Sequence, residues 1–571
     1  MSASHATEIA QKWECMMFAD AHAFSAPFQV CIVGAGPVGL AVALELSRLN
    51  LRTLLIDAGA KRARRPLPNE APFDVREGQN HCGDYETLGT GLGGTSRWWG
   101  GKCVEFDDID FAKRSYIGDG NWPISHGELS PFYERARAIL SCDADIDEPG
   151  AIAAPGFFRS LERWTRVRDT AVANEKELRS SRYLTVVLNT RVHSIGFDPV
   201  TGMVRKLGVS CRGHFHFISA QHFVLACGGR GNARLLFNLQ AEFPDLFSGE
   251  KGPLGRFYMG HLAGEIAQVQ FASSEQARSY WFYKSANGTF VRRRFQPGAQ
   301  LQSELGVSNI AMWPQNRDIA TAVRGDTTSS LGYVLKNMKS NSENRRRMEQ
   351  SIAPHLWNLA RNPLRSISSA VKLFHKRVLL HEPHLFVPDR HHLYRLRYHA
   401  EQVPNRESRV FLSRVRDRDG SLKLDVSFRY STQDYQSTVL AHQALDLWLS
   451  RQGVGRLVFM GEAQDLERLV AMQAKDGYHQ IGVTRMSGNR RDGVVNADCR
   501  VHDIPNLFVA GSSVFVTSGQ ANPTLPAVAM AVRLAHHIHR SLYSVAPATI
   551  MGARPLDILP PPSEIAQGLH D

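Results

Sequence analysis

Residues 512–538 read SSVFVTSGQANPTLPAVAMAVRLAHHI and place Asn522 and Pro523 directly before an apolar run with a helical pattern. Asn is a favoured N-cap residue, and Pro is tolerated at the first helical position, where its missing N–H would have no partner. The backbone donors and the dipole at a helix N-terminus also favour negative charge. The segment therefore predicts either a purely structural cap or a helix start directed at an anion, or at a group that becomes one.

A second chemical signal lies near the start of the chain, in FQVCIVGAGPVGLAVALELSRLNLRTLLIDAG, residues 28–59. A strand, a GxGxxG turn, a helix, a second strand and an acid follow one another. Gly34 permits a tight turn, Gly36 lets a pyrophosphate approach the backbone, and Gly39 lets helix and strand pack closely. Asp57 would accept hydrogen bonds from a ribose. The predicted dinucleotide contacts are Gly34, Gly36, Pro37, Val38, Gly39 and Asp57.

The turn alone does not distinguish FAD from NAD, but two further glycine-rich segments favour FAD. The loop GTGLGGTSRWWGGKC, residues 89–103, is too long and too aromatic for a nicotinamide site alone. Its glycines let backbone approach a flat ring system, and Trp98 or Trp99 would shield that ring from water. HFVLACGGRGNARLLF, residues 222–237, predicts another strand, turn and helix against a dinucleotide. The predicted contacts here are Gly94, Thr95, Ser96, Trp99, Gly100, Gly101, Ala226 and Gly228.

Length and composition limit the class of protein. A chain of 571 residues exceeds the size of one growing core, so we expect two closely associated domains. No run of about 18 apolar residues predicts a membrane span, and the first 27 residues lack the pattern of a secretory signal. The eight cysteines are scattered without a CxxC pair, so free thiols, a cytoplasmic location and no metal are expected. The cluster His536, His537 and His539 is interpreted as a solvated helix face.

Positive charge is concentrated in one segment of the chain, residues 336–377. This segment holds ten Lys or Arg and two Glu, a surplus of eight within a net charge of +12. Its apolar residues fall at helical spacing, interrupted by Pro354 and Pro363. The segment indicates a solvated helical insertion or, as the alternative, a basic amphipathic helix on a membrane or partner. Nucleic acid is not expected, because no DNA- or RNA-binding motif accompanies the charge.

These pieces together resemble the glucose-methanol-choline (GMC) oxidoreductases, which bind FAD and oxidise alcohols. The resemblance covers nearly the whole chain and includes, in the family's order, the GAGPVG unit, GGTSRWWGG, LTVVLNTRVHSI (184–195, similar to the adenine-side strand), FVLACGG, PLGRFYMGH (253–261), EQVPNRESRVFL (401–412) and the tail from YHQIGVTRM to SGQANPT. The tail is the most specific piece. In the family a catalytic His there is followed some forty residues later by a His or an Asn.

The resemblance implies the roles of two residues. His479 would accept the alcohol proton, since an imidazole is a base near neutral pH, while the hydride goes to the flavin. Asn522 would donate a hydrogen bond to the same oxygen. The helix that follows would direct its N-terminus at the flavin, where reduction places negative charge. Further cofactor contacts are implied at Val192, Gly511, Ser512, Asn522, Pro523 and Thr524.

His81, His261 and His502 compete with His479 for the role of the base, and the same resemblance makes His261 and His502 structural. GGTSRWWGG contains no His, whereas some relatives attach FAD through a His in this loop, so non-covalent FAD is expected.

The implied fold class is α/β: a Rossmann-like FAD-binding domain and a second α+β substrate domain built on an antiparallel sheet, the GMC or p-hydroxybenzoate-hydroxylase-like architecture. The FAD-binding parts are expected at 26–110, 184–265 and 490–545. The remaining parts are a substrate-side or lid insertion at 111–183, a substrate-binding segment at 266–489 that carries the basic insertion, and a tail at 546–571.

The predicted function is FAD-dependent oxidation of a small-molecule alcohol. A sugar or glycoside is the first substrate hypothesis, because the His/Asn choice and the SGQANPT tail are similar to sugar-oxidising bacterial members. A sterol, lipid or natural-product alcohol is the alternative, and a non-redox flavin-bound lyase or structural FAD protein is the alternative of another class. No motif reports the electron acceptor, oxygen or another compound, or the oligomeric state.

Overall fold

The computed structural model describes residues 21–66, 73–76, 80–143, 156–316, 327, 330–331, 333–334, 342–374, 388–417 and 420–543. Within 342–374 it describes the side chains from 352 to 371 only. The predicted tail at 546–571 lies outside the described residues, as do 336–341 and 375–377 of the basic segment.

A parallel sheet of five strands forms one half of the molecule. In spatial order its strands are β19 (Leu507–Val509), β10 (Ala220–Leu225), β1 (Phe28–Val33), β2 (Thr53–Ile56) and β6 (Leu184–Val187). The strands are mostly buried and apolar, as is usual when helices or other layers cover both faces of a parallel sheet. The two strands predicted in the GAGPVG unit are confirmed.

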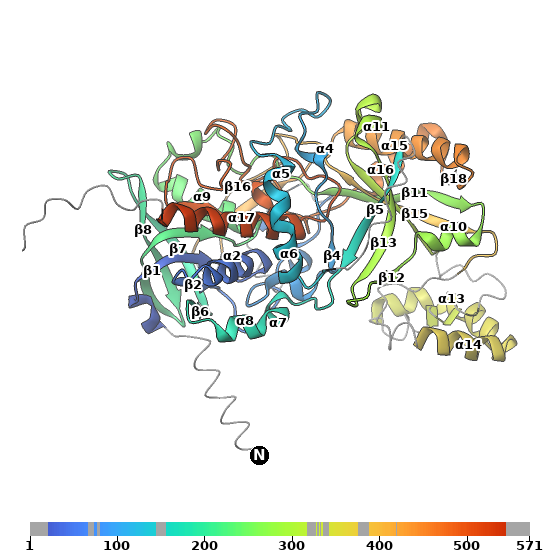
Figure 1. The fold of residues 1–571 in the computed structure, drawn as a ribbon, viewed down its shortest axis with the longest axis horizontal. Coiled ribbons are helices and arrows are strands. Elements are labelled where there is room, and N and C mark those ends of the chain that lie inside the picture. The colour runs from blue at the N-terminus through green and yellow to red at the C-terminus, as the bar shows by residue number, and fades with distance from the viewer. Residues whose placement is uncertain are drawn as a thin grey trace, which may run out of the picture.

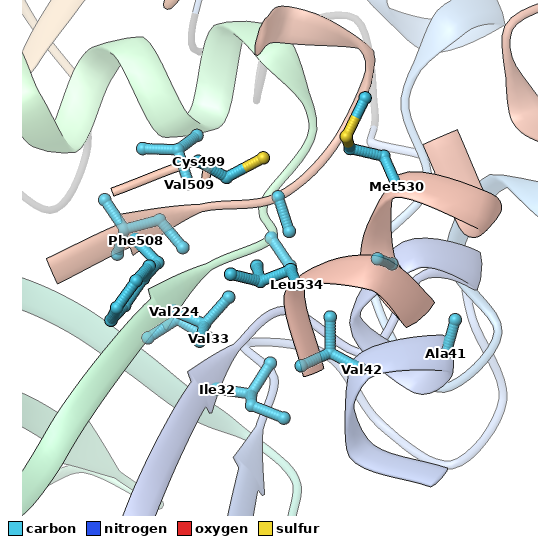
Figure 2. Close-up of a cluster of buried hydrophobic side chains, with 14 of the residues drawn as sticks. Ile32, Val33, Ala41, Val42, Val224, Cys499, Phe508, Val509, Met530 and Leu534 are labelled. Carbon is cyan, nitrogen blue, oxygen red and sulfur yellow. The ribbon is translucent and has the colours of Figure 1, made fainter. Parts of the chain in front are cut away.

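Two helices, α2 (Pro37–Arg48) and α17 (Thr524–Tyr543), pack on this sheet and on each other. Figure 2 shows Met530 and Leu534 of α17 above Val42 of α2 and above Ile32 and Val33 of β1. All of these side chains are almost fully buried. The first and last long helices of the described chain therefore share one core, which holds the two ends of the sequence in one unit.

An antiparallel sheet of eight strands forms the other half, drawn on the right in Figure 1. Its strands are, in order, β18 (Gly455–Phe459), β11 (His261–Phe271), β15 (Leu393–Glu401), β14 (Ile310–Gln315), β13 (Phe290–Pro297), β5 (Phe157–Trp164) and β4 (Lys102–Cys103), with β12 (Tyr283–Lys284) on β13. The helices α15 (Thr432–Arg451) and α16 (Leu466–Gln473) pack against it. The predicted α/β class with a second, antiparallel domain is confirmed.

The two faces of this sheet differ in polarity. Leu396 and Tyr398 of β15 and Phe295 of β13 belong to the apolar core beneath α15 and α16. The residues that alternate with them, such as His399 and Arg294, point to the opposite face. A sheet face that carries imidazoles and guanidinium groups inside a protein requires polar partners, and the loops of the parallel-sheet half provide them.

Two small sheets and several short helices complete the described chain. The first small sheet is β16 (Arg409–Arg416), β17 (Leu422–Ser427) and β3 (Phe73–Val75); the second is β7 (Thr190–Asp198), β8 (Met203–Cys211) and β9 (His214–Ile218). The other helices include α3 (Asp84–Thr87), α4 (Asp108–Phe111), α5 (His126–Leu129), α6 (Tyr133–Ile139), α7 (Thr170–Ala173), α8 (Glu175–Ser180), α9 (Gly229–Glu242), α10 (Ser274–Ser279), α11 (Ala299–Leu305), α13 (Ser342–Arg361) and α14 (Pro363–Phe374).

Some predicted elements differ in their limits. The strand expected at 184–195 is two strands, β6 and β7, because Asn189 adopts a left-handed φ of 55° and turns the chain out of the parallel sheet. The alternating pattern of LKLDVSFRYS, residues 422–431, predicts a strand over the whole stretch, but β17 ends at Ser427. The antiparallel sheet also recruits β5 from the segment 111–183 and begins β11 at His261, so its strands cross the expected domain limits. We retain those limits as a proposal.

Candidate functional site

The loop that follows α16 holds His479, and a buried carboxylate shapes it. Asp476 Oδ1 accepts the backbone N–H groups of Gly477, Tyr478 and His479 at 2.7, 2.9 and 3.2 Å. Asp476 Oδ2 accepts the backbone N–H of His261 and the Nδ1–H of His479, both at 2.8 Å. Burial acts to raise the pKa of Asp476, but its interactions with His479 and His261 lower it well below its usual range. Asp476 is thus an anion that fixes both the loop and the ring.

The network also determines which nitrogen of His479 is free. His261 Nε2 lies 3.3 Å from the carbonyl oxygen of Ser518, which only accepts, so this nitrogen carries the proton. Burial lowers the pKa of His261, so its ring is neutral and its Nδ1 is a lone pair. That lone pair lies 2.9 Å from His479 Nδ1, which must therefore be the donor, shared between His261 and Asp476. In neutral His479 this leaves Nε2 unprotonated.

Asn522 faces that unprotonated nitrogen. The Asn522 Nδ2 lies 3.4 Å from His479 Nε2, across 43 residues of sequence. The Asn522 side chain is directed at the imidazole, and α17 starts one residue later than expected, with Pro523 O accepting the first helical bond from Ala527 N at 2.9 Å. The structure thus brings together the two residues that the resemblance singled out.

A third imidazole, His399 of β15, stacks on His261 at a centroid distance of 4.1 Å and an angle of 22°. His399 Nδ1 donates to the carbonyl oxygen of Gln520 at 2.8 Å. Burial, followed by the neighbouring His261 and His479, lowers the pKa of His399 well below its usual range. Nitrogen atoms of the three rings lie within 4.8 Å of one another. The lone pair of an imidazole nitrogen lies in the plane of its ring. Because the rings of His261 and His399 are stacked, their lone pairs do not point at one shared ion.

The loop before Asn522 is anchored to both halves of the molecule. Thr517 Oγ1 accepts from Trp122 Nε1 at 2.9 Å, and Ser518 Oγ accepts from the backbone N–H of Gln402 at 2.9 Å. Gln520 Oε1 accepts from Arg294 Nη1 at 2.8 Å, and Gln520 Nε2 donates to Asp107 Oδ2 at 3.1 Å. These bonds hold the start of α17 against the polar face of the antiparallel sheet.

A cluster of cations lies on the same sheet face as His399. Arg292 of β13 pairs with Glu162 of β5, and Lys102 Nζ lies 3.6 Å from Glu162 and 4.1 Å from the centre of the Trp313 ring. Burial lowers the pKa of Lys102 to about 8, against the effect of Glu162. Burial acts to raise the pKa of Glu162, yet Arg292 and Lys102 lower it to about 2. The sheet face above Gln520 is therefore rich in hydrogen-bond donors and positively charged.

The parallel sheet offers a dinucleotide site at the carboxyl ends of its strands. From β1 the chain passes to β2 on one side, while β10 and β19 lie on the other, so the strand order reverses next to β1. Ligands bind at such a reversal in open α/β sheets. The predicted contacts Gly34, Asp57, Ala226 and Gly511 directly follow β1, β2, β10 and the β19 region, which places them at one edge.

The GAGPVG turn fits a pyrophosphate. A Cβ on Gly39 would lie 1.8 Å from Gly34 O, and one on Gly34 would lie 2.5 Å from Ala226 O. Neither position therefore has room for a side chain. A Cβ on Gly36 would meet nothing within 4 Å. Gly36 precedes α2, whose N-terminus has no side-chain cap and has Pro37 at the first position. Open space beside uncapped backbone donors is the cradle that a phosphate requires, so the residues present fit FAD.

Asp57 joins the two glycine-rich loops. Its Oδ2 accepts from Ala35 N, and its Oδ1 accepts from the N–H groups of Gly59 and Gly91, all at 2.8 Å. An ionised carboxylate has about four acceptor positions. Three are used by backbone, which leaves one for the ribose hydroxyl that the sequence predicts.

The second glycine loop lies on the first, because a Cβ on Gly94 would approach Gly36 Cα to 2.9 Å. Not all of its predicted contacts face open space. Ser96 is buried and bonds Gly93 O and Thr170 N, and Trp99 Nε1 donates to Arg168 O at 2.8 Å. Thr95 and Gly100 are exposed.

The remaining predicted contacts are spread over several elements. Gly101 packs against Thr165, and Gly228 precedes α9. Ser512 Oγ donates to Gln480 O at 3.0 Å, which ties this edge to the His479 loop. Pro523 and Thr524 form the start of α17, and Val192 lies on β7.

Three further histidines, His81, His536 and His537, form structural contacts. His81 bonds Tyr258 Oη at 2.9 Å and Cys82 O at 2.7 Å, and burial lowers its pKa to about 4. His536 and His537, expected on a solvated face, lie 2.8 Å from Glu45 and 3.4 Å from Asp498, carboxylates distant in sequence.

Sequence reasoning missed Asp476 and His399 and made His261 merely structural. The spacing of Asp476 and His479 in DGYH was a readable signal for the carboxylate.

Comparisons with known proteins indicate the class of this chain. A family model, GMC oxidoreductase, matches residues 404–531, which contain both His479 and Asn522. A 2-methyl-1,2-propanediol dehydrogenase of Mycolicibacterium austroafricanum is 23% identical over 90% of this chain and 95% of the relative. A C-glycoside 3-oxidase of Arthrobacter globiformis is 35% identical over 145 residues, 24% of this chain and 25% of the relative.

Among solved structures, pyridoxine 4-oxidase from Mesorbium loti aligns with a TM-score of 0.47 at 17% identity over 90% of this chain and 99% of that chain. A fungal aryl-alcohol oxidase aligns with a TM-score of 0.49 at 11% identity over the same shares.

The fold, the dinucleotide edge and the His–Asn pair define a flavoprotein that oxidises alcohols, with FAD as its cofactor. Residues 404–531 match the GMC oxidoreductase family model, and the chain is an FAD-dependent oxidoreductase acting on CH–OH groups.

Proposed function

We propose that this chain oxidises a polyhydroxylated alcohol, with a sugar or glycoside as the first candidate, using His479 Nε2 as the base. The observation that carries the proposal is the 3.4 Å distance between the Asn522 amide and His479 Nε2, the nitrogen for which the hydrogen-bond network leaves no proton in neutral His479. A proton acceptor and a hydrogen-bond donor converge there on one small region, as the carbinol oxygen of an alcohol requires.

When bound, FAD would supply the acceptor for the hydride equivalent that leaves the carbinol carbon. The substrate O–H lies against His479 Nε2, which takes the proton. The Asn522 Nδ2–H donates to the same oxygen as alkoxide character develops. Asp476 Oδ2 stabilises the imidazolium that forms, because the carboxylate is buried and already bonded to Nδ1–H.

The cofactor contacts predicted from the sequence remain part of this proposal, with Gly36 and the start of α2 at the pyrophosphate and Asp57 at the ribose. Non-covalent FAD belongs to it as well. A reducing cytoplasm is the proposed location, which the free thiols of the seven described cysteines support.

The polar sheet face favours a hydroxylated substrate. Arg294 and Gln520 are 2% and 1% exposed, and with Lys102 they make the sheet face beside the loop before Asn522 polar, which suits a hydroxylated substrate better than a sterol. The names of two relatives, a diol dehydrogenase and a C-glycoside 3-oxidase, are consistent with a polyol or glycoside. A lipid or natural-product alcohol is the second candidate. A non-redox role is disfavoured, because it gives the His479–Asn522 pair no task.

Anaerobic stopped-flow absorbance at the oxidised flavin band tests the proposal with monosaccharides, glycosides, diols and sterols. We expect a sugar, glycoside or polyol to bleach the flavin. His479→Ala should keep its FAD and lose about 10²- to 10⁴-fold in reduction rate, and Asn522→Ala about 10²- to 10³-fold. His391→Ala, an exposed histidine in a turn, is the control and should reduce normally. Reduction of His479→Ala at the parent rate would show that another group is the base.

A further inference from the structure

The helices α13 and α14 lie side by side at the edge of the molecule, below α10 and β12 in Figure 1. They belong to the insertion between β14 and β15 of the antiparallel sheet. No part of the proposed reaction uses them, and the sequence left their role open between a solvated helix and a basic amphipathic surface.

The inner face of this helical insertion is polar. Ser330, His355, Asn358 and Ser369 are each at most 6% exposed. Ser330 Oγ lies 3.3 Å from His355 Nδ1 and 3.3 Å from Asn358 Nδ2, and Ser369 Oγ lies 2.9 Å from Thr327 Oγ1. These hydrogen bonds, together with the stacked rings of Tyr333 and His355 at a centroid distance of 4.0 Å, attach both helices to the residues between 327 and 333.

The outer face is apolar, which reverses the polarity of an ordinary surface helix. Leu364, Ile367 and Val371 of α14 are 83%, 63% and 62% exposed, and their spacing places them on one side of the helix. Leu356 and Trp357 of α13 are 48% and 66% exposed. Of the 20 large apolar side chains exposed in the described chain, five fall within residues 356–371. We name these five residues the apolar outer face.

Positive charge accompanies the apolar outer face. Arg361 and Arg365 are exposed at the junction of the two helices, and the sequence from 336 to 377 carries a surplus of eight positive charges. Peripheral membrane helices combine these features: apolar side chains enter the acyl boundary, Trp lies at the headgroup level, and Lys or Arg contact anionic lipid. None of the helices in the described chain is long and apolar enough to cross a bilayer.

We propose that α13 and α14 dock this protein onto an anionic phospholipid surface, through the apolar outer face and its flanking arginines. The charge selects lipid over a second copy of the chain, because two identical basic faces would repel each other in a symmetric contact. The cytoplasmic leaflet is the anionic surface such a site would meet. Docking brings the substrate half of the enzyme close to the bilayer, since the insertion leaves the antiparallel sheet.

Vesicle co-sedimentation of the FAD-loaded protein tests this directly. We expect the protein to pellet with phosphatidylcholine vesicles that contain phosphatidylglycerol and to remain in solution with phosphatidylcholine alone. Raising the salt concentration should release it, because screening weakens attraction to charged headgroups. Arg361→Gln/Arg365→Gln should weaken the binding.

The variant Leu364→Ser/Ile367→Ser/Val371→Ser should lower partitioning about tenfold or more, because three side chains no longer leave water on binding. It should keep its flavin and its rate of flavin reduction by alcohol. Met472→Ser on α16, at a residue 75% exposed, is the matched control and should bind like the parent.

Three outcomes would overturn the proposal. The first is that the parent protein pellets with neither kind of vesicle, and the second is that it pellets equally with both. The third is that the triple variant binds vesicles as well as the parent does. If light scattering shows that the parent self-associates, the triple variant is a monomer and vesicles bind neither, the apolar outer face is a contact between copies instead.

Discussion

Asp476 decides the protonation pattern of the proposed base. Its Oδ2 accepts from both His261 N and His479 Nδ1, while its Oδ1 accepts from three successive backbone N–H groups. An isosteric amide can retain the Oδ1 bonds. At the Oδ2 position, however, its NH₂ group would face two donors.

Asp476→Asn should therefore favour the tautomer of His479 that carries its proton on Nε2 instead of Nδ1. We expect FAD binding to be retained and the flavin-reduction rate to fall about 10²-fold or more, since the base is protonated at the reacting nitrogen. The acid limb of the rate against pH should move to lower pH, because the imidazolium loses its carboxylate partner. Stopped-flow reduction across a pH series measures both effects.

Asp498→Asn is a matched control, because Asp498 also pairs with a histidine, His537, at 3.4 Å but away from the site. Its rate and pH profile should equal those of the parent. A parental pH profile for Asp476→Asn would show that the carboxylate does not position the base.

The two proposed reacting residues could be predicted from the sequence because a motif carries them. The partners of His479 follow from three-dimensional packing instead. His399 reaches the site only because β15 pairs with β11, where His261 starts, and no local pattern records that pairing.

The first turn of α2 offers a separate test of the cofactor site. Gly36 has φ −72° and ψ −179°, which any residue adopts, and a Cβ there meets no protein atom within 4 Å. Gly36→Ala should therefore fold as the parent does. The added methyl group occupies the space proposed for the pyrophosphate, so FAD affinity should fall about tenfold or more. Apoprotein titrated with FAD, followed by flavin fluorescence, gives the value.

Gly39→Ala provides the contrast, because its Cβ would lie 1.8 Å from Gly34 O and would disturb the protein itself. Its thermal stability should fall along with its FAD affinity. If Gly36→Ala binds FAD as tightly as the parent, the pyrophosphate lies elsewhere.

The pair Glu162–Arg292 joins β5 to β13 in the buried part of the antiparallel sheet. Glu162→Gln would leave Arg292 and Lys102 without their shared anion. We expect a loss of about 3 to 5 kcal/mol in the free energy of unfolding, measured by denaturant titration. Glu175→Gln breaks an exposed pair with Arg179 on α8 and should cost less than about 0.5 kcal/mol. Similar losses for the two variants would contradict the role of burial.

The sequence predicts the helices and strands that have strong local signals, but it predicts their first and last residues less accurately. The strands and helix of the GAGPVG unit lie where expected because periodicity and glycine spacing act locally. The division of 184–195 into β6 and β7 depends on one backbone angle at Asn189. The recruitment of β4 and β5 into the antiparallel sheet depends on long-range pairing with β13, which local propensity does not encode.

The complete molecule buries several titratable groups, and these oppose one another in its response to pH. Burial lowers the pKa of His442 on α15 to about 4. Burial raises the pKa of Asp434, on the same helix, to about 6. A histidine of depressed pKa binds its proton more readily when unfolded, so its stability contribution is complete above about pH 6.5 and is lost as the pH falls toward 4. Asp434 acts in the opposite direction, so the total pH dependence does not isolate either group.

The difference between two variants does isolate His442. Its ring is fully buried among apolar residues, and its Nδ1 donates to Thr438 O at 2.7 Å. His442→Leu should have nearly the parent's stability at about pH 7.5. On acidification to about pH 4.5 the parent should lose up to about 3 kcal/mol more than the variant, because only the parent must keep an imidazole neutral. Urea unfolding of both proteins, with exposed His391→Leu as the control, measures this. Parallel pH profiles for parent and His442→Leu would mean that the ring reaches water or an anion in the folded protein.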